Sequence, residues 1–196
     1  LDEYGVNSHL IEYGADHLMN FSNTSSLIDG DYYFAMARCQ SDNNISEILS
    51  AFASTDQKLI FVSNWDDSDY GKNLFKTYKD FKNIELLNPV YDNSIVYTYR
   101  SSCIAYIHGH SAGGTNPSLI EAMICGSICI CFDNTFNRYT TEDNGYFWRS
   151  KEELIKIIQN FDKNEIDKEI FKKIASSRYK WSRIVDEYNS LMSDVL

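Results

Sequence analysis

The chain has 196 residues, of which 43% are hydrophobic, so it has enough apolar material for one domain with a core and is not a disordered chain. Its formal net charge of -10 disfavours a general nucleic-acid binder, and an anionic ligand would need a local attraction such as a helix N-terminus or a well-placed arginine. No signal peptide opens the sequence and no apolar run approaches the ~20 residues of a membrane span, so we predict a cytoplasmic protein.

Strand-like and helix-like segments alternate along the chain. Apolar runs typical of buried strands occupy residues 31–38, 58–63, 84–87, 103–107 and 127–132. Helical spacing of apolar residues occurs at 45–53, 70–81, 92–101, 117–125 and 151–160, and we expect a loop between 132 and 151. This alternation predicts βαβ units, hence a Rossmann-like α/β domain with a parallel sheet covered by helices on both faces.

The two ends of the chain differ from this pattern. We interpret residues 1–30 as a linker and first-strand region, and 1–196 as a single domain. The tail 163–196 carries apolar residues at helical spacing with no strand between them, which predicts one or two amphipathic helices. Such a tail must pack on this sheet or on a partner domain.

The five cysteines do not form a recognisable framework, because their number is odd and their spacing irregular. Cys129 and Cys131 alternate within an apolar run, so we expect both thiols on one strand face. Small core residues are a better interpretation than metal ligands, since no further ligands complete a tetrahedral set. We predict no bound metal.

The segment with the clearest chemical meaning follows the strand that ends near Ile107. Glycines precede Asn116, a favoured N-cap, and Pro117, which suits the first helical position. A helix start behind a glycine-rich loop presents backbone N–H groups that suit a diphosphate. Glu121, one turn into the helix, leans back toward that site and could bind a ribose diol. The alternative is a capped core helix with a solvated glutamate.

The same residues carry a family resemblance. The stretch 110–123, HSAGGTNPSLIEAM, and Glu121-Ala-Met-Ile-Cys-Gly126 resemble the donor-binding domain of GT-B glycosyltransferases, in the retaining family that includes sucrose and glycogen synthases. The nearest likeness is to bacterial rhamnosyltransferases of polysaccharide assembly. Residues 37–45 resemble the family's first-strand loop, and 178–188, RYKWSRIVDEY, resemble its closing helix, which crosses back toward an N-terminal domain.

This resemblance implies a reaction and a set of site residues. The domain would bind a nucleoside-diphosphate sugar, either dTDP-rhamnose or a UDP-sugar, without a cofactor or metal, for transfer to a saccharide or lipid-linked acceptor. Arg38 and Glu121 would be the catalytic residues, with Arg38 contacting the diphosphate and Glu121 the ribose. The other implied diphosphate ligands are Asn43, Asn64, Thr115, Asn116, Pro117 and Ser118. The implied sugar ligands are His110, Gly113 and Gly114, and the implied base contacts are Val90 and Tyr91.

Two departures from the family pattern bear on activity. Gly113 stands where the family has a glutamate that contacts the donor sugar, and Asn43 replaces a lysine of the diphosphate pair. Both fit the rhamnosyl subgroup better than the broad family. They also leave open a non-catalytic module that binds a nucleotide or nucleotide sugar.

Other expectations concern partners and rivals. An acceptor domain would precede this chain, which begins without methionine, and the full-length protein would be able to associate with the inner face of the membrane. Asp66, Asp67 and Asp69 resemble a carboxylate cluster, although a solvated loop is the better interpretation. A receiver-like signalling domain is a third hypothesis, and it predicts an acidic pocket with no affinity for diphosphate.

Overall fold

A six-stranded sheet forms the centre of the computed structural model, which describes residues 5, 9–21 and 28–195. Every pairing is parallel, and the strand order is β3-β2-β1-β4-β5-β6. The strands are β1 (Tyr33–Met36), β2 (Leu59–Val62), β3 (Ile84–Leu87), β4 (Ala105–His108), β5 (Cys129–Phe132) and β6 (Tyr146–Trp148). This architecture confirms the Rossmann-like α/β fold and the helical tail expected from the sequence.

Helices alternate with these strands. They are α1 (Ile45–Phe52), α2 (Asp69–Tyr78), α3 (Asn93–Ser102), α4 (Pro117–Ile124), α5 (Thr135–Thr141), α6 (Lys151–Asn160), α7 (Glu169–Arg178) and α8 (Trp181–Val195). Short 3-10 helices lie at Asp16–Asn20, Ser41–Asn43 and Trp65–Asp67. All four residues of β2 are buried, because helices cover both faces of the sheet.

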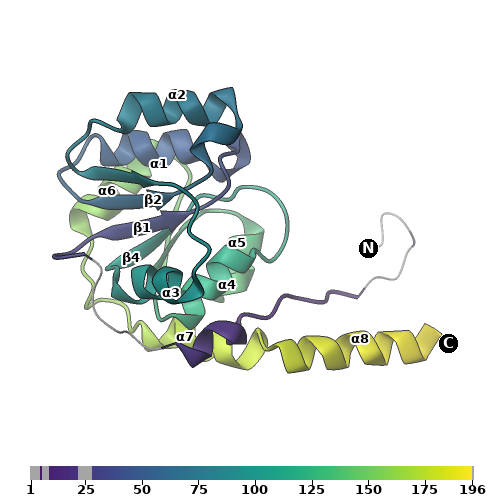
Figure 1. The fold of residues 1–196 in the computed structure, drawn as a ribbon. Helices are drawn as coiled ribbons and strands as arrows, with labels where there is room; N and C mark the ends of the chain where they lie inside the picture. The colour runs from purple at the N-terminus through teal and green to yellow at the C-terminus, as the bar shows by residue number, and fades with distance from the viewer. Residues whose placement is uncertain (1–4, 6–8, 22–27, 196) are drawn as a thin grey trace.

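The alternation of side chains along β1 divides the core between these two faces. Tyr33 contacts the ring of Phe52 in α1 and donates its hydroxyl to a carbonyl in α6. Phe34 points the other way and stacks on Tyr99 of α3 at a centroid distance of 5.3 Å. Helices α1 and α2 accordingly lie on one side of the strands, and α3 and α4 on the other (Figure 1).

The order of the strands reverses at β1. The chain passes from β1 outward to β2 and β3, and then returns to place β4 on the opposite side of β1. Connections that depart in opposite directions leave a crevice beyond the carboxyl ends of the two central strands, which is where open α/β sheets bind ligands.

The N-terminal segment packs against the junction of α7 and α8. Arg178 pairs with the buried Glu12, with 2.6 Å between Nη2 and Oε1. The backbone N–H of Ala15 donates to the carbonyl of Tyr179, and the ring of Trp181 lies against Gly14, where a side chain would have no space. Beyond this junction α8 extends away from the rest of the domain (Figure 1).

Two sequence expectations need correction or refinement. The predicted loop between 132 and 151 is wrong, because it contains α5 and β6. The described part of 1–30 contains one 3-10 helix, Asp16–Asn20, and the first strand begins after it, at Tyr33. The remainder of 1–30 lies outside the described residues.

Candidate functional site

A cavity of about 600 Å³ opens where the chain leaves the carboxyl ends of β1, β2 and β4. Its wall combines the loop after β1, the loop after β2, the turn after β3 and the first turn of α4. A volume of this size is typical of small-molecule sites, and the location is the crevice that the strand order creates.

The loop after β1 presents an arginine to this cavity. Arg38 lines the wall and is exposed, and its side chain makes no hydrogen bond or ion pair with any residue that the structure describes. Its backbone is held in place, because Asn43 Nδ2 donates to the Arg38 carbonyl at 2.9 Å and Ser63 Oγ donates to the Ala37 carbonyl at 2.7 Å. A fixed backbone with a free guanidinium suits an arginine that binds an anion.

The start of α4 forms the opposite side of the opening. Asn116 caps the helix as predicted, since its Oδ1 accepts the Ser118 N–H at 2.9 Å and Pro117 follows it at the first position. The Asn116 carbonyl accepts the next two N–H groups, so the donors of the first turn are satisfied internally. Within the described chain, the backbone N–H groups of residues 113–115 have no partner. The loop therefore offers an anion more free donors than the helix start does.

Glu121 is paired with a buried arginine that we did not predict. Arg100 is 1% exposed, and its Nη1 lies 2.7 Å from Glu121 Oε2. The other carboxylate oxygen, Oε1, lies 3.6 Å from Nε2 of His17, and the side chain as a whole is 23% exposed and lines the cavity. The pairing with Arg100 offsets the cost of a carboxylate in the cavity wall and leaves acceptor positions of that carboxylate available.

Arg100 also connects the two central strands with α4. Its Nη2 donates to Ser118 Oγ at 3.2 Å, and Tyr106 donates its hydroxyl to the Met36 carbonyl at 3.0 Å. Ser118 Oγ lies within hydrogen-bond distance of both, at 3.1 Å from Tyr106 Oη and 3.2 Å from the Met36 carbonyl. The floor of the cavity is thus a polar network that includes a buried charge.

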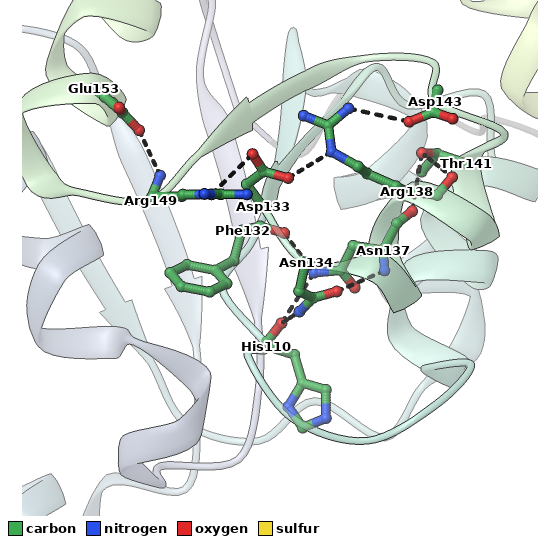
Figure 2. A network of polar contacts seen from close by, with 10 residues as sticks. All are labelled: His110, Phe132, Asp133, Asn134, Asn137, Arg138, Thr141, Asp143, Arg149 and Glu153. Atoms are coloured by element: carbon green, nitrogen blue, oxygen red, sulfur yellow. Dashed lines mark hydrogen bonds and ion pairs between the residues drawn. The ribbon is translucent and has the colours of Figure 1, made fainter.

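The loop after β4 is fastened from two sides. His110 Nδ1 lies 2.9 Å from Asn43 Oδ1, so the imidazole contacts the loop after β1. On the other side, Asn134 and Asn137 both donate a side-chain N–H to the His110 carbonyl at 3.0 Å. Figure 2 shows these two amides converging on that carbonyl, within a network that extends to Asp133, Arg138 and Arg149.

His108 is a buried imidazole in the cavity wall. It is 5% exposed, its Nε2 has no hydrogen-bond partner among the described residues, and its ring lies 6.1 Å from that of Tyr106. Burial, reinforced by the neighbouring His110 and Arg100, lowers the pKa of His108 to about 3. The ring is therefore neutral at pH 7.

This buried imidazole predicts sensitivity to acid. His108 has a lower pKa in the folded chain than its ordinary 6.5, so below pH 6.5 the unfolded chain binds a proton that the folded chain does not. Moving from pH 7.5 to pH 5 is expected to lower the free energy of unfolding by about 2 kcal/mol through this group. Urea denaturation at both pH values measures the loss, which is expected to shrink in His108→Gln. An equal loss in both proteins would contradict the assignment.

Most of the predicted site residues reach this cavity. Those that line it are Arg38, Asn43, Asn64, Tyr91, His110, Asn116, Pro117, Ser118 and Glu121. Three of them have engaged side-chain amides: Asn116 caps α4, Asn43 binds the Arg38 carbonyl and His110, and Asn64 binds the Cys39 N–H and Asp67.

Four predicted residues do not line the cavity. Val90 packs its side chain on the core beside α3, so only its neighbours Pro89 and Tyr91 face the opening. Thr115, Gly113 and Gly114 lie in the loop before α4 and outside the wall. Gly113 has φ of +93°, a backbone conformation that a residue with a side chain rarely adopts.

The sequence prediction omitted several wall residues. These are Met36, Ala37, Gln40, Asp42, Val62, Ser63, Asp67, Pro89, Arg100 and His108. Arg100 could have been noticed, because it lies four residues after Val96 on the face of α3 that the apolar pattern assigns to the core. Asp67, which we assigned to a solvated loop, accepts from Asn64 at 2.6 Å and faces the cavity.

The described part of the chain contains neither a metal-binding cluster nor a disulfide. No group of three or more His, Cys, Asp or Glu side chains is placed to hold a metal ion there. Cys129 and Cys131 are buried within β5, with free thiols. No described helix has both the length and the apolar character needed to cross a bilayer.

Comparison with known proteins points to one family. The model of the family described as glycosyl transferases group 1 matches residues 23–178. No curated protein sequence matches the chain.

Solved structures agree in fold. Sucrose-phosphate synthase from Thermosynechococcus elongatus superimposes with a TM-score of 0.72 at 16% identity, over 94% of this chain and 50% of that one. HepE from Anabaena in complex with UDP-glucose gives 0.77 at 17% identity, over 93% and 56%. The pneumococcal O-GlcNAc transferase GtfA, in complex with UDP and GlcNAc, gives 0.68 at 14% identity, over 94% and 38%. The chain spans about half the length of the first two.

Proposed function

The chain belongs to the glycosyl transferases group 1 family, and on that premise we propose that it is the donor-binding half of a transferase that uses a nucleoside-diphosphate sugar. The acceptor is a saccharide or a lipid-linked saccharide. The likeness in fold to HepE, which was solved with UDP-glucose, supports a donor of this class. Membership of the family argues against the receiver-like alternative.

The observation that carries the proposal is an unengaged arginine in the wall of a cavity whose opposite side is the capped start of α4. Arg38 lies on one side, and the loop of residues 113–115, whose backbone N–H groups have no partner among the described residues, leads into α4 on the other. In a chain of net charge -10 these groups supply the local attraction that a diphosphate needs. Thr115, Asn116 and Ser118 complete the proposed diphosphate region, together with Asn43, Asn64 and Pro117.

The remaining residues are assigned to the ribose, the base and the sugar of the donor. Glu121, oriented by Arg100, accepts hydrogen bonds from the ribose hydroxyls. Tyr91 and Val90 border the base, with Tyr91 88% exposed at the rim. His110, Gly113 and Gly114 face the sugar. For Glu121, Tyr91 and His110 the assignment combines the predicted role with a place in the cavity wall. For Val90, Gly113 and Gly114, which do not line the cavity, it rests on the family resemblance alone.

The proposed reaction breaks the bond between the anomeric carbon and the diphosphate oxygen and forms a bond from that carbon to the oxygen of an acceptor hydroxyl, whose proton passes to the leaving diphosphate. The leaving diphosphate gains negative charge, which Arg38 and the loop N–H groups stabilise without a metal. We propose retention of configuration and rhamnose as a candidate sugar, on the family likeness of residues 110–123. We also propose a cytoplasmic location with contact at the inner face of the membrane.

The proposed acceptor site lies in a domain that precedes this chain. The chain spans about half of the sucrose-phosphate synthase and HepE structures, so catalysis would need the other half. We therefore expect these 196 residues to bind donor and to turn over little of it. Measurement of sugar transfer by the isolated chain tests this, and robust turnover would contradict it.

A non-catalytic module for nucleotide sugars is the second candidate. The observation that favours it is Gly113, where the resembling family has an acidic residue that contacts the sugar. The full-length protein, supplied with donor and a panel of acceptors, separates the two functions, because only the transferase consumes donor in an acceptor-dependent manner.

The donor site itself is tested by calorimetric titration with UDP, dTDP and GDP and with their sugars. Replacing Arg38 with alanine is expected to weaken the best ligand about 10- to 100-fold, since it removes a charge-assisted contact to the diphosphate. Glu121→Ala is expected to weaken it about tenfold through lost ribose contacts. Arg183→Ala is the matched control, because Glu187 on α8 is the one partner that Arg183 has among the described residues. Unchanged affinity in both site variants would refute this site.

A further inference from the structure

We propose that Nε2 of His110 accepts a hydrogen bond from a hydroxyl of the donor sugar. Asn43 and Asn137 are positioning residues: Asn43 fixes the ring of His110, and Asn137 fixes its backbone. This inference rests on the proposed function, because it assumes a nucleotide sugar in the cavity. It assigns to α5 a role in the donor site that neither the motifs nor the family resemblance indicated.

The backbone of His110 is fixed by a buried amide. Asn137 is 2% exposed, and its Nδ2 donates to the carbonyls of His110 at 3.0 Å and Phe132 at 2.8 Å. Asn134 donates to the same His110 carbonyl and accepts the Asn137 N–H at 2.8 Å (Figure 2). Rotation of the His110 peptide would leave buried polar groups without partners, at a cost of about 1–3 kcal/mol each. The start of α5 therefore sets the direction of the loop after β4.

The tautomer of His110 follows from a second amide. Asn43 Nδ2 donates to the Arg38 carbonyl, so the other end of that amide, Oδ1, is the atom that faces His110 Nδ1 at 2.9 Å. An amide oxygen can only accept, so the proton of the imidazole lies on Nδ1. Asp42 Oδ2, 3.8 Å from the same nitrogen, favours the same arrangement. The lone pair of the neutral ring is then on Nε2.

A lone pair at Nε2 selects the chemistry of its partner. It accepts from a hydroxyl, whereas an ionised phosphate has no proton to donate to it. The ring lines the cavity, and its side chain is 20% exposed. A Cβ built on Gly113 would lie 3.3 Å from Nε2, so the glycine keeps this approach open. The donor ligand has hydroxyls on its ribose, which are assigned to Glu121, and on its sugar, so a sugar hydroxyl is the group that remains for His110.

The test compares UDP with UDP-glucose as calorimetric probes of the 196-residue chain. His110→Ala is expected to weaken UDP-glucose about 3- to 10-fold, the loss of one hydrogen bond, while UDP changes less than about twofold. Asn137→Ala is expected to cause the same selective loss and to add nothing in the His110→Ala background. Asn134→Ala serves in its place should Asn137→Ala fail to fold.

Asn83→Ala is the matched control. Its Nδ2 also fastens a loop, by donating to the carbonyls of Phe52, Thr55 and Gln57, but it lies outside the cavity wall. It is expected to lower stability without changing the ratio of the two dissociation constants. Additive losses in the double variant, or equal losses for UDP and UDP-glucose, would overturn the positioning role.

A ligand-free measurement separates this inference from the proposed function. The chain has four histidines, so nitrogen-15 spectra of the rings can be assigned by substitution. We expect His110 to carry its proton on Nδ1 and to lose that preference in Asn43→Ala, and a proton on Nε2 in the wild type would overturn the inference. If neither these probes nor dTDP, GDP and their sugars bind, the donor proposal fails and the spectra alone decide the tautomer. If UDP binds and His110→Ala leaves the ratio of the UDP and UDP-glucose dissociation constants unchanged, the donor proposal stands and the sugar contact is refuted.

Discussion

Replacing Arg100 with methionine is expected to lower the free energy of unfolding by about 3 kcal/mol, the low end for breaking a buried ion pair. Arg100 is 1% exposed and lies 2.7 Å from Glu121, and its other terminal nitrogen donates to Ser118. Without the guanidinium, the Glu121 carboxylate keeps its charge in a partly desolvated wall with no strong partner. Urea denaturation at pH 7.5 measures the change.

A double-mutant cycle separates the pair from the volume of the side chain. Glu121→Gln alone leaves the buried Arg100 charge unpaired, so each single variant is destabilised, whereas the double variant Arg100→Met with Glu121→Gln is expected to lose less than the sum. Arg183→Met is the control, since its exposed pair with Glu187 on α8 is worth under about 0.5 kcal/mol. Additive losses in the double variant would contradict a direct contact.

Arg100 illustrates what the sequence could not provide at the site. Arg38 and Glu121 follow strands, and the carboxyl ends of parallel strands meet at one edge, so their proximity could be predicted from order alone. The contact of Arg100 with Glu121 depends instead on how α3 packs beside α4 across one face of the sheet. Local spacing contains no information on that packing, and the same holds for His110 and Asn43, which are 67 residues apart in sequence.

The fold was predictable where periodicity is strong. The apolar runs of β1, β2 and β5 and the helical spacing of α1 and α6 exceed what a loop would contain, and all five occur near the expected bounds. The segment 133–150 was missed for two physical reasons. Helix α5 is short and mostly polar, with Thr, Asn and Arg among its seven residues, and β6 has only three residues, which are all aromatic. Tertiary contacts, not local pattern, determine both.

Gly145, which precedes β6, packs closely against β5 within the segment 133–150. Gly145→Ala is therefore expected to lower the free energy of unfolding by about 4 kcal/mol. Two effects combine in that figure. The residue has φ of +103°, which alanine adopts with strain, and an added Cβ would clash with the Cys129 carbonyl oxygen in β5. Because that neighbour is backbone, β6 would have to move away from β5.

Gly126 supplies the control that isolates the clash from the strain. Its φ is +78° and an added Cβ would meet nothing within 4 Å, so Gly126→Ala is expected to cost only the backbone strain, about 1–2 kcal/mol. Displacement of β6 would also disturb α5, which joins β5 to β6 and holds the His110 carbonyl through Asn137. Gly145→Ala is therefore expected to shift the His110 amide resonance, whereas Gly126→Ala is not. Equal losses of stability in the two variants would show that the contact with Cys129 relaxes without cost.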